Sequence, residues 1–269
     1  MDVASLGYRT DLAIRRAEGS QITDRGDHIV ISSEQNPGYR WGNFFLLACP
    51  PRPGELPAWL ARFAVRFPTA THRAFGLDVT DMADVGQDVF AEAGFSAERY
   101  VVLTASSVSQ ARQPGLTAVV RQLDGDDDWR QSGELRAACG GSGQTAEAAV
   151  SAAEQEFHAR RLSARRRLAE TGRAAWFGAF AGGRLVAQLG LVPVGDGGAR
   201  YQDVETHPDF RRLGLAGTLV CRAGRHGLAE PGVSRLVMVA DPGYPAIRLY
   251  ESLGFSRTED QVGFERITE

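Results

Sequence analysis

The second half of the chain carries the most regular pattern of hydrophobic and polar positions. From Ala174 onward this pattern predicts strand, turn, strand, strand, loop, helix, strand and helix, in that order. Residues 176–180 and 185–191 are predicted as strands, and the Gly182-Gly183 pair between them favours a tight hairpin. Residues 200–206 form the next predicted strand. The segment therefore opens with a hairpin and a third strand.

Two later segments have apolar residues at helical spacing. They are Ala216, Leu219, Val220 and Ala223 in the first, and Ala246, Leu249, Tyr250 and Leu253 in the second. The first predicted helix ends near Gly227, and Gly254 is placed to cap the second. Residues 236–240 form a short apolar run between them, consistent with a buried strand. The strand–helix–strand order predicts an α/β domain with a crossover connection.

The region between residues 104 and 150 contains two breaks in the pattern. Residues 105–115 are polar and end in Pro114-Gly115, which predicts a linker between a domain of residues 1–104 and a domain of residues 116–269. The second break, Gly140 to Gly143, separates two predicted helices. The first runs from about Asp128 to Cys139 after a helix-starting turn at Asp126-Asp127-Asp128, and the second starts near Thr145.

The second of these helices continues into a strongly basic stretch, residues 160–167. One interpretation is a solvated helix end, where cations suit the helix dipole. The other is a rim that attracts an anionic substrate. The sequence leaves both open.

Composition narrows the class of protein. The chain has 269 residues, 43% of them apolar and 23% charged, and a net charge of −3, which describes a globular protein without the basic face that nucleic acid or an anionic membrane would need. We find neither a membrane-spanning apolar run nor a secretory leader, and the three cysteines match neither a disulfide framework nor a metal site. We therefore expect a cytoplasmic protein with no metal, no membrane association and no nucleic-acid partner.

Every basic residue of the chain, 30 in all, is arginine. The absence of lysine excludes Schiff-base chemistry, a pyridoxal phosphate site and the lysine-containing phosphate loop. Any phosphate site must instead rely on arginine and on backbone N–H groups.

The segment from Val204 to Thr218 runs from a strand into the first turn of a helix. A helix start exposes backbone N–H groups and positive dipole, which suits a phosphate. Gly214 removes a Cβ where a ligand would touch the backbone, and Arg211 and Arg212 add charge-assisted hydrogen bonds. The segment does not match the G-x-G-x-x-G fingerprint of dinucleotide-binding folds. It therefore predicts a site for a pyrophosphate or a phosphorylated ribose in a different fold.

Two motifs carry a resemblance to a known family. Residues 211–216, Arg-Arg-Leu-Gly-Leu-Ala, fit the pattern [Q/R]-x-x-G-x-[G/A], and residues 246–255 fit A-x-x-L-Y-x-x-x-G-F. With these motifs in this order and a strand between them, the chain from Leu116 to Glu269 resembles the GNAT superfamily of N-acetyltransferases.

The resemblance implies acetyl-CoA as cosubstrate and direct transfer of its acetyl group to an amine. By motif match, Tyr250 supplies a proton to the departing thiolate. Glu205 is our first choice for the base, Asp203 on the same strand is the second, some members use a water chain, and His207 is a loop residue. Gly243 stands where the family often has Asn. The residues expected to bind the cofactor are Val204, Thr206, Arg211, Arg212, Leu213, Gly214, Leu215, Ala216, Gly217 and Thr218, with the backbone of Thr206 pairing with the pantetheine arm.

The first half of the chain is a diverged copy of the second. A shift of 160 positions places Gly54 on Gly214, Gly94-Phe95 on Gly254-Phe255 and residues 75–79 on 235–239. Because this offset stays constant without gaps, we predict two GNAT-like domains of the α/β (α+β) class, each with a mixed central sheet flanked by helices.

The copy has lost the residues that the chemistry needs. Phe90 stands opposite Tyr250 and Phe45 opposite Glu205, and neither ring can donate or accept a proton. Residues 49–57 contain four prolines without N–H groups, together with Glu55, which would repel a phosphate. We predict that this half does not bind CoA, packs on the active half and contributes to the acceptor pocket.

The leading hypothesis is an N-acetyltransferase that acts on a small amine or an amino terminus. The alternative from another class is a CoA-binding sensor or scaffold without turnover, and a nucleotide or dinucleotide enzyme has only the loop in its favour. A homodimer is compatible with the sequence.

Overall fold

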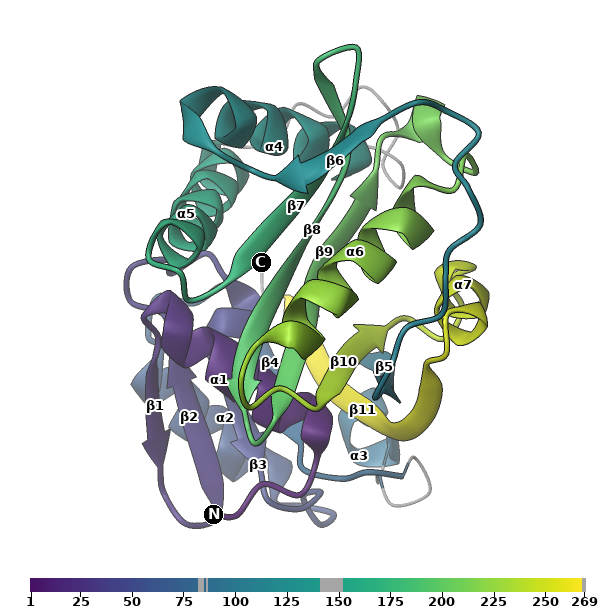
Figure 1. Ribbon diagram of the computed structural model, residues 1–269. Coiled ribbons are helices and arrows are strands. Elements are labelled where there is room, and N and C mark those ends of the chain that lie inside the picture. The colour runs from purple at the N-terminus through teal and green to yellow at the C-terminus, as the bar shows by residue number, and fades with distance from the viewer. Residues whose placement is uncertain (82–84, 86, 141–151, 268–269) are drawn as a thin grey trace. The chain divides into compact units, whose positions relative to one another are not determined.

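The computed structural model describes residues 1–81, 85, 87–140 and 152–267 (Figure 1). The chain divides into two compact units. Unit 1 comprises residues 1–102, 239–243 and 257–269, and unit 2 comprises residues 103–238 and 244–256.

Unit 1 is a mixed sheet with helices. The sheet follows the order β1 (Gln21–Asp24), β2 (His28–Ser32), β3 (Phe44–Leu47), β4 (His72–Leu77), β11 (Ser256–Ile267) and β5 (Ser96–Ala105). Its helices are α1 (Leu6–Glu18), the 3-10 turn η1 (Arg40–Gly42), α2 (Leu56–Arg66) and α3 (Gln87–Glu92). Strands β1, β2 and β3 are antiparallel neighbours, β3 and β4 are parallel, and β4 and β11 are antiparallel.

The core of unit 1 is built mainly from phenylalanine rings. Phe45, Phe63, Phe75 and Phe90 are at most 2% exposed and belong to one cluster with Phe264 of β11. The Phe264 ring stacks on the Phe90 ring, with centroids 4.0 Å apart and planes 5° from parallel. The last strand of the chain thus completes the core of its first half.

This arrangement differs from the predicted division into residues 1–104 and 116–269. Strand β11 pairs with β4 from Val262↔Leu77 to Ile267↔His72, so residues 257–269 belong to unit 1. The reason is tertiary, because β11 buries Val262 and Phe264 in the phenylalanine cluster. A boundary drawn along the sequence cannot represent pairing between strands that are so far apart in the chain.

Unit 2 contains the elements predicted for the second half. Its sheet follows the order β10 (Arg235–Ala240), β9 (Gly198–Thr206), β8 (Arg184–Gly195), β7 (Ala175–Ala181) and β6 (Val119–Gln122). Its helices are α4 (Gly125–Gly140), α5 (Ala152–Glu170), the 3-10 turn η3 (Pro208–Phe210), α6 (Leu215–Ala229) and α7 (Ala246–Ser252). The predicted hairpin is confirmed, since Gly182 and Gly183 take φ values of 56° and 82° between β7 and β8. The predicted start of the second helix near Thr145 lies outside the described residues.

Helices cover both faces of the unit 2 sheet (Figure 1). On one face, the Tyr201 hydroxyl of β9 donates to the Val220 carbonyl of α6 at 2.8 Å. On the other, Arg136 of α4 forms an ion pair with Glu205 of β9. Because their β8 partners, Leu191 and Gln188, are three positions apart, Tyr201 and Glu205 point to opposite faces.

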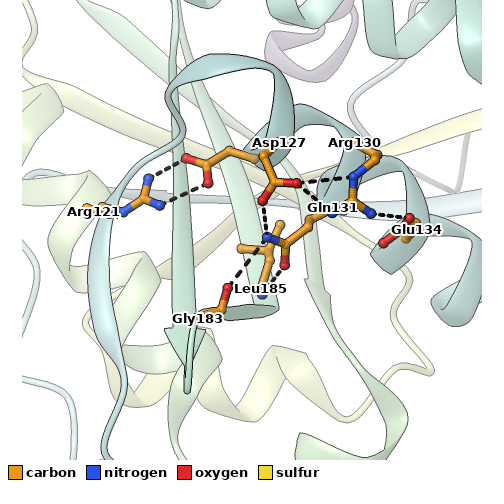
Figure 2. Close-up of polar contacts among 8 residues, drawn as sticks. Arg121, Asp127, Arg130, Gln131, Glu134, Gly183 and Leu185 are labelled. Atoms are coloured by element: carbon orange, nitrogen blue, oxygen red, sulfur yellow. Dashed lines mark hydrogen bonds and ion pairs between the residues drawn. The ribbon is translucent and has the colours of Figure 1, made fainter.

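The start of α4 is fixed by polar contacts to the neighbouring hairpin (Figure 2). The Gln131 side chain accepts a hydrogen bond from the Leu185 backbone N–H at 2.8 Å and donates to Asp127 at 2.9 Å. Asp128 accepts from Arg121 of β6 at 2.9 Å. The acidic helix start is confirmed, although α4 begins at Gly125, earlier than predicted. These contacts fix the position of α4 against the sheet.

Candidate active site

Strands β9 and β10 pair only over the first third of β9. They pair in parallel from Gly198↔Arg235 to Arg200↔Val237, and over the described residues the register goes no further, although β9 continues to Thr206. In the same stretch β9 forms a bulge against β8, where Asp203 takes φ 49°. The bulge includes Val204 and bends the strand. The C-terminal half of β9 therefore offers backbone groups that β10 does not use.

The predicted phosphate loop lies directly after this stretch. Gly214 is the N-cap of α6, with φ 84°, and Arg212 also takes a positive φ of 64°. Helix α6 begins here with the N–H groups of residues 215–218. By helix geometry, the N–H groups before Thr218 have no hydrogen-bond partner within the helix. Thr218 closes back on Gly214, with its hydroxyl donating to the Gly214 carbonyl at 3.1 Å. The loop has the form of an anion site at a helix start.

The structure gives a different reason for the glycines of this loop. A Cβ on Gly214 would lie 3.1 Å from the Cα of Pro114, and a Cβ on Gly217 would lie 3.3 Å from Leu249 of α7 and 3.6 Å from Ala111. Packing within unit 2 therefore disfavours a Cβ at both positions, and the ligand contact expected at Gly214 stays a prediction. The linker and α7 occupy that space, and Gly214 is also required by its positive φ.

The linker lies along α6 and α7 of unit 2. The backbone N–H of Ser109 donates to Leu253, and that of Gly115 donates to Leu213, both at 2.9 Å. The Cys221 thiol of α6 donates to the Ser109 carbonyl, also at 2.9 Å. The linker thus packs beside the predicted phosphate loop. No local feature of its polar sequence indicated this packing.

Tyr250 lies on α7 and is 5% exposed. Its ring meets the Phe255 ring edge-on with centroids 6.4 Å apart, and Tyr201 approaches Phe255 in the same manner at 5.8 Å. Burial raises the pKa of Tyr250, and the nearby Tyr244 adds to the shift. The hydroxyl is therefore protonated at neutral pH, which is the state that a proton donor needs.

Both candidate bases sit in buried ion pairs. Arg136 contacts one oxygen of Glu205, and the Gln188 side chain donates to the other at 2.8 Å. Asp203 pairs with Arg165 of α5 at 2.6 Å. Sequence reasoning found neither Arg136 nor Gln188 as site residues, because they come from α4 and β8 and belong to no local motif.

The end of β9 is also engaged by its neighbours. The Thr206 carbonyl accepts from Nε of Arg211 at 3.3 Å and from the Cys139 thiol at 3.4 Å. His207 caps η3 by accepting from the Asp209 N–H at 3.3 Å, in keeping with its expected place in the loop. Arg211 thus reaches from the phosphate loop back to the strand end.

The internal repeat is visible in the elements. Shifted by 160 positions, α2 falls within α6, α3 falls on residues 247–252 of α7, and both β5 and β11 begin at matching residues, Ser96 and Ser256. Gly54 takes φ 86° where Gly214 takes 84°. These helices and the starts of β5 and β11 therefore recur at the offset of 160 positions. The strands between them do not keep it, since β3 and β4 shift to residues 204–207 and 232–237, whereas β9 and β10 span residues 198–206 and 235–240.

The two copies differ at the strands that part in unit 2. In unit 1, β3 stays paired with β4 to its last residue, Leu47↔Leu77. The Phe75 ring lies against both Phe45 and Phe90, with centroids 6.1 and 6.0 Å apart. In the first copy the strands are thus paired to the end of β3 and the core is packed with rings, whereas in the second copy β9 continues past its pairing with β10.

The described residues contain neither a helix that could span a membrane nor a cluster of side chains that could hold a metal ion. Within these residues, no helix is long and apolar enough to cross a membrane. No group of three or more His, Cys, Asp or Glu side chains among them is arranged to hold a metal ion.

Solved structures share this fold over nearly the whole chain. A conserved protein of unknown function from Staphylococcus epidermidis ATCC 12228 superposes with a TM-score of 0.72 at 10% identity, covering 93% of this chain and 95% of its own. A GCN5-related N-acetyltransferase from Kribbella flavida gives 0.64 at 15% identity, covering 97% and 96%. A tandem GNAT protein from the clavulanic acid biosynthesis pathway gives 0.53 at 18% identity, covering 81% and 71%. At these identities the likeness concerns the fold alone.

Sequence comparison identifies the family. No curated protein matches the chain significantly. The model of the acetyltransferase (GNAT) family matches residues 144–255, a range that includes the parted strand β9, the loop after it and Tyr250. The two motifs and the family match agree, and residues 144–255 form a domain of the acetyltransferase (GNAT) family.

Proposed function

We propose that the second half of the chain transfers the acetyl group of acetyl-CoA directly to the amine of a small molecule or of an amino terminus. The parting of β9 from β10, next to the loop that starts α6, carries this proposal. An extended arm can pair with the unused backbone groups of β9 as an added strand does, while its phosphates lie at the helix start. Residues 204–206 and 211–218 would hold acetyl-CoA in this way.

The transfer forms a C–N bond and breaks the C–S bond of the thioester. The amine must lose a proton, and the departing thiolate must gain one. Tyr250 is our candidate for the second proton, because its buried hydroxyl is protonated at neutral pH. Glu205 remains our first candidate for the base, with Asp203 second. Both carboxylates are paired with an arginine, and a guanidinium can neither accept nor relay a proton. Either carboxylate must therefore receive the amine proton directly or through a water.

The first half of the chain is proposed to bind no CoA. Its strands stay paired where an arm would enter, and Phe90 replaces the proton donor. Isothermal titration calorimetry with CoA tests this directly. We expect one CoA per chain, and two would contradict the proposal for this half.

Two measurements separate the enzyme from its alternatives. Acetyl-CoA, but not NAD or ATP, should raise the Tm, because only a ligand that binds the native state stabilises it. Free thiol release in a screen of amines should then exceed the release without amine. A raised Tm with no amine-dependent thiol release would favour the CoA-binding sensor or scaffold, and a Tm raised only by NAD or ATP would overturn the proposal.

A further inference from the structure

Arg136 of α4 lies beside the end of β9 and uses only part of its hydrogen-bonding capacity there. Its Nη1 contacts Glu205, and among the described residues this guanidinium makes no other hydrogen bond or ion pair. The side chain is 37% exposed. A guanidinium carries five N–H donors in a planar fork, so most of them remain for a ligand.

Glu205 and the residues bonded to it fix the position of Arg136. Glu205 has a side chain only 6% exposed, and its second oxygen accepts from Gln188 at 2.8 Å. Gln188 in turn accepts from the Ser132 hydroxyl at 2.6 Å, and Ser132 lies one turn before Arg136 on α4. Because each partner is itself bonded, Glu205 holds Arg136 rather than facing solvent.

The place of Arg136 in unit 2 puts it at the proposed site of transfer. Cys139, one turn further along α4, contacts the Thr206 carbonyl at 3.4 Å, where β9 has parted from β10. Arg136 reaches Glu205 from the α4 face of the sheet, whereas the phosphate loop leads into α6 on the other face. Arg136 and the helix that follows the phosphate loop therefore lie on opposite faces of β9.

The surroundings of Arg136 carry a positive balance. Four arginines, Arg136, Arg161, Arg165 and Arg211, stand among three carboxylates, those of Asp203, Glu205 and Glu154. Burial and three of these arginines lower the pKa of His158 on α5, in spite of the opposing effect of Glu154. The arginines therefore outnumber the carboxylates in this part of unit 2 by one.

We propose that Arg136 binds a carboxylate of the acceptor, so that the acceptor is an amine that carries a carboxylate, as a free amino acid does. This inference rests on the proposed acetyl transfer and names its substrate class. A guanidinium pairs with a carboxylate through two parallel N–H···O bonds, which selects for the anion and fixes its orientation. Of the two interpretations of the basic stretch 160–167, it adopts the rim that attracts an anionic substrate, with Arg136 as its contact residue.

The test compares amino acids with their uncharged amides in the full-length chain. For the wild type we expect kcat/KM to be about 10- to 100-fold higher for the acid, the range for hydrogen bonds to a charged group. Arg136→Lys keeps a cation beside Glu205 but loses the fork. It should raise KM for the acid about tenfold or more, raise KM for the amide much less, and so reduce the preference.

Two further variants guard against a merely structural effect. Arg160→Lys, on the exposed side of α5 where it pairs with Glu156, is the matched control and should keep the preference of the wild type. The double variant Arg136→Gln with Glu205→Gln removes both charges together, so that no buried carboxylate is left unpaired. Because Glu205 is also the candidate base, this variant is tested by thermal shift with an N-acetyl amino acid and its amide, and the two shifts should be equal.

The outcomes distinguish this inference from the proposed function. Equal turnover of acid and amide by the wild type would overturn the carboxylate site and leave acetyl transfer intact. If no amine supports thiol release, acetyl transfer fails, and thermal shift with an N-acetyl amino acid and its amide then decides the site. A larger shift for the acid that Arg136→Lys abolishes would support it, and equal shifts would overturn it.

Discussion

The clearest structural prediction concerns Phe264, because it links the last strand of the chain to the core of its first half. Phe264 is 2% exposed and stacks on Phe90 at a centroid distance of 4.0 Å. Replacing it with alanine removes the ring and leaves a cavity against fully buried neighbours. Deleting a buried phenylalanine ring costs about 3–5 kcal/mol in unfolding free energy, which includes the cavity that the neighbours cannot fill.

The expected loss is large enough to measure by heating. For a chain of this size, 1 kcal/mol corresponds to about 2–4 °C in Tm, so Phe264→Ala should lower the Tm of the transition that includes unit 1 by about 6–20 °C. Circular dichroism and scanning calorimetry can follow it, and calorimetry also shows whether the two units unfold together.

The matched control lies on the same strand. Ile267 is 65% exposed, and Ile267→Ala should change the unfolding free energy by no more than about 0.5 kcal/mol. A Phe264→Ala protein as stable as the Ile267→Ala protein would refute the reasoning, because β11 would then add nothing to the core of unit 1.

Three further predictions address the site and its supports. Tyr250→Phe should leave CoA binding near the wild-type value and lower kcat about 10²- to 10⁴-fold, the range for a positioned proton donor, and an unchanged kcat would remove Tyr250 from that role. Gly214→Ala should lower the Tm even without ligand, and more than Gly54→Ala does, because both positions have a positive φ but only at Gly214 would the Cβ meet another segment within 4 Å. The Arg121 hydrogen bond, outweighing burial, lowers the pKa of Asp128, so Asp128→Asn should cost about 1–3 kcal/mol at pH 7. A depressed carboxyl pKa gives its full stabilisation above the pKa of the unfolded state and loses it as the pH falls through the lower pKa of the folded state. Urea unfolding at several pH values should therefore show this difference shrink below about pH 4 and vanish at still lower pH.

The local elements could be predicted from the sequence with small errors. The hairpin at Gly182-Gly183, the helix that carries Ala216 and Leu219 and the one that carries Tyr250 each depend on residue spacing and turn chemistry over about ten positions. The loop from Arg211 to Ala216 was recognisable for the same reason, since the motif and the helix start that it makes are both local. The offset of 160 positions also predicted a repeat, and α2, α3 and the start of β5 match α6, α7 and the start of β11 at this offset, whereas β3 and β4 do not coincide with β9 and β10.

Contacts between distant segments decided the rest. Pairing of β11 with β4 moved residues 257–269 into unit 1, and packing of the linker against Gly214 gave that glycine a reason other than a ligand. Arg136 lies at the candidate site because α4 packs on β9, and no motif near Arg136 in the sequence predicts that packing. The sequence by itself determined which segments become helices, strands and loops, since those choices depend on near neighbours. Which segments meet depends on burial and pairing across the whole chain, and only the tertiary structure decided that.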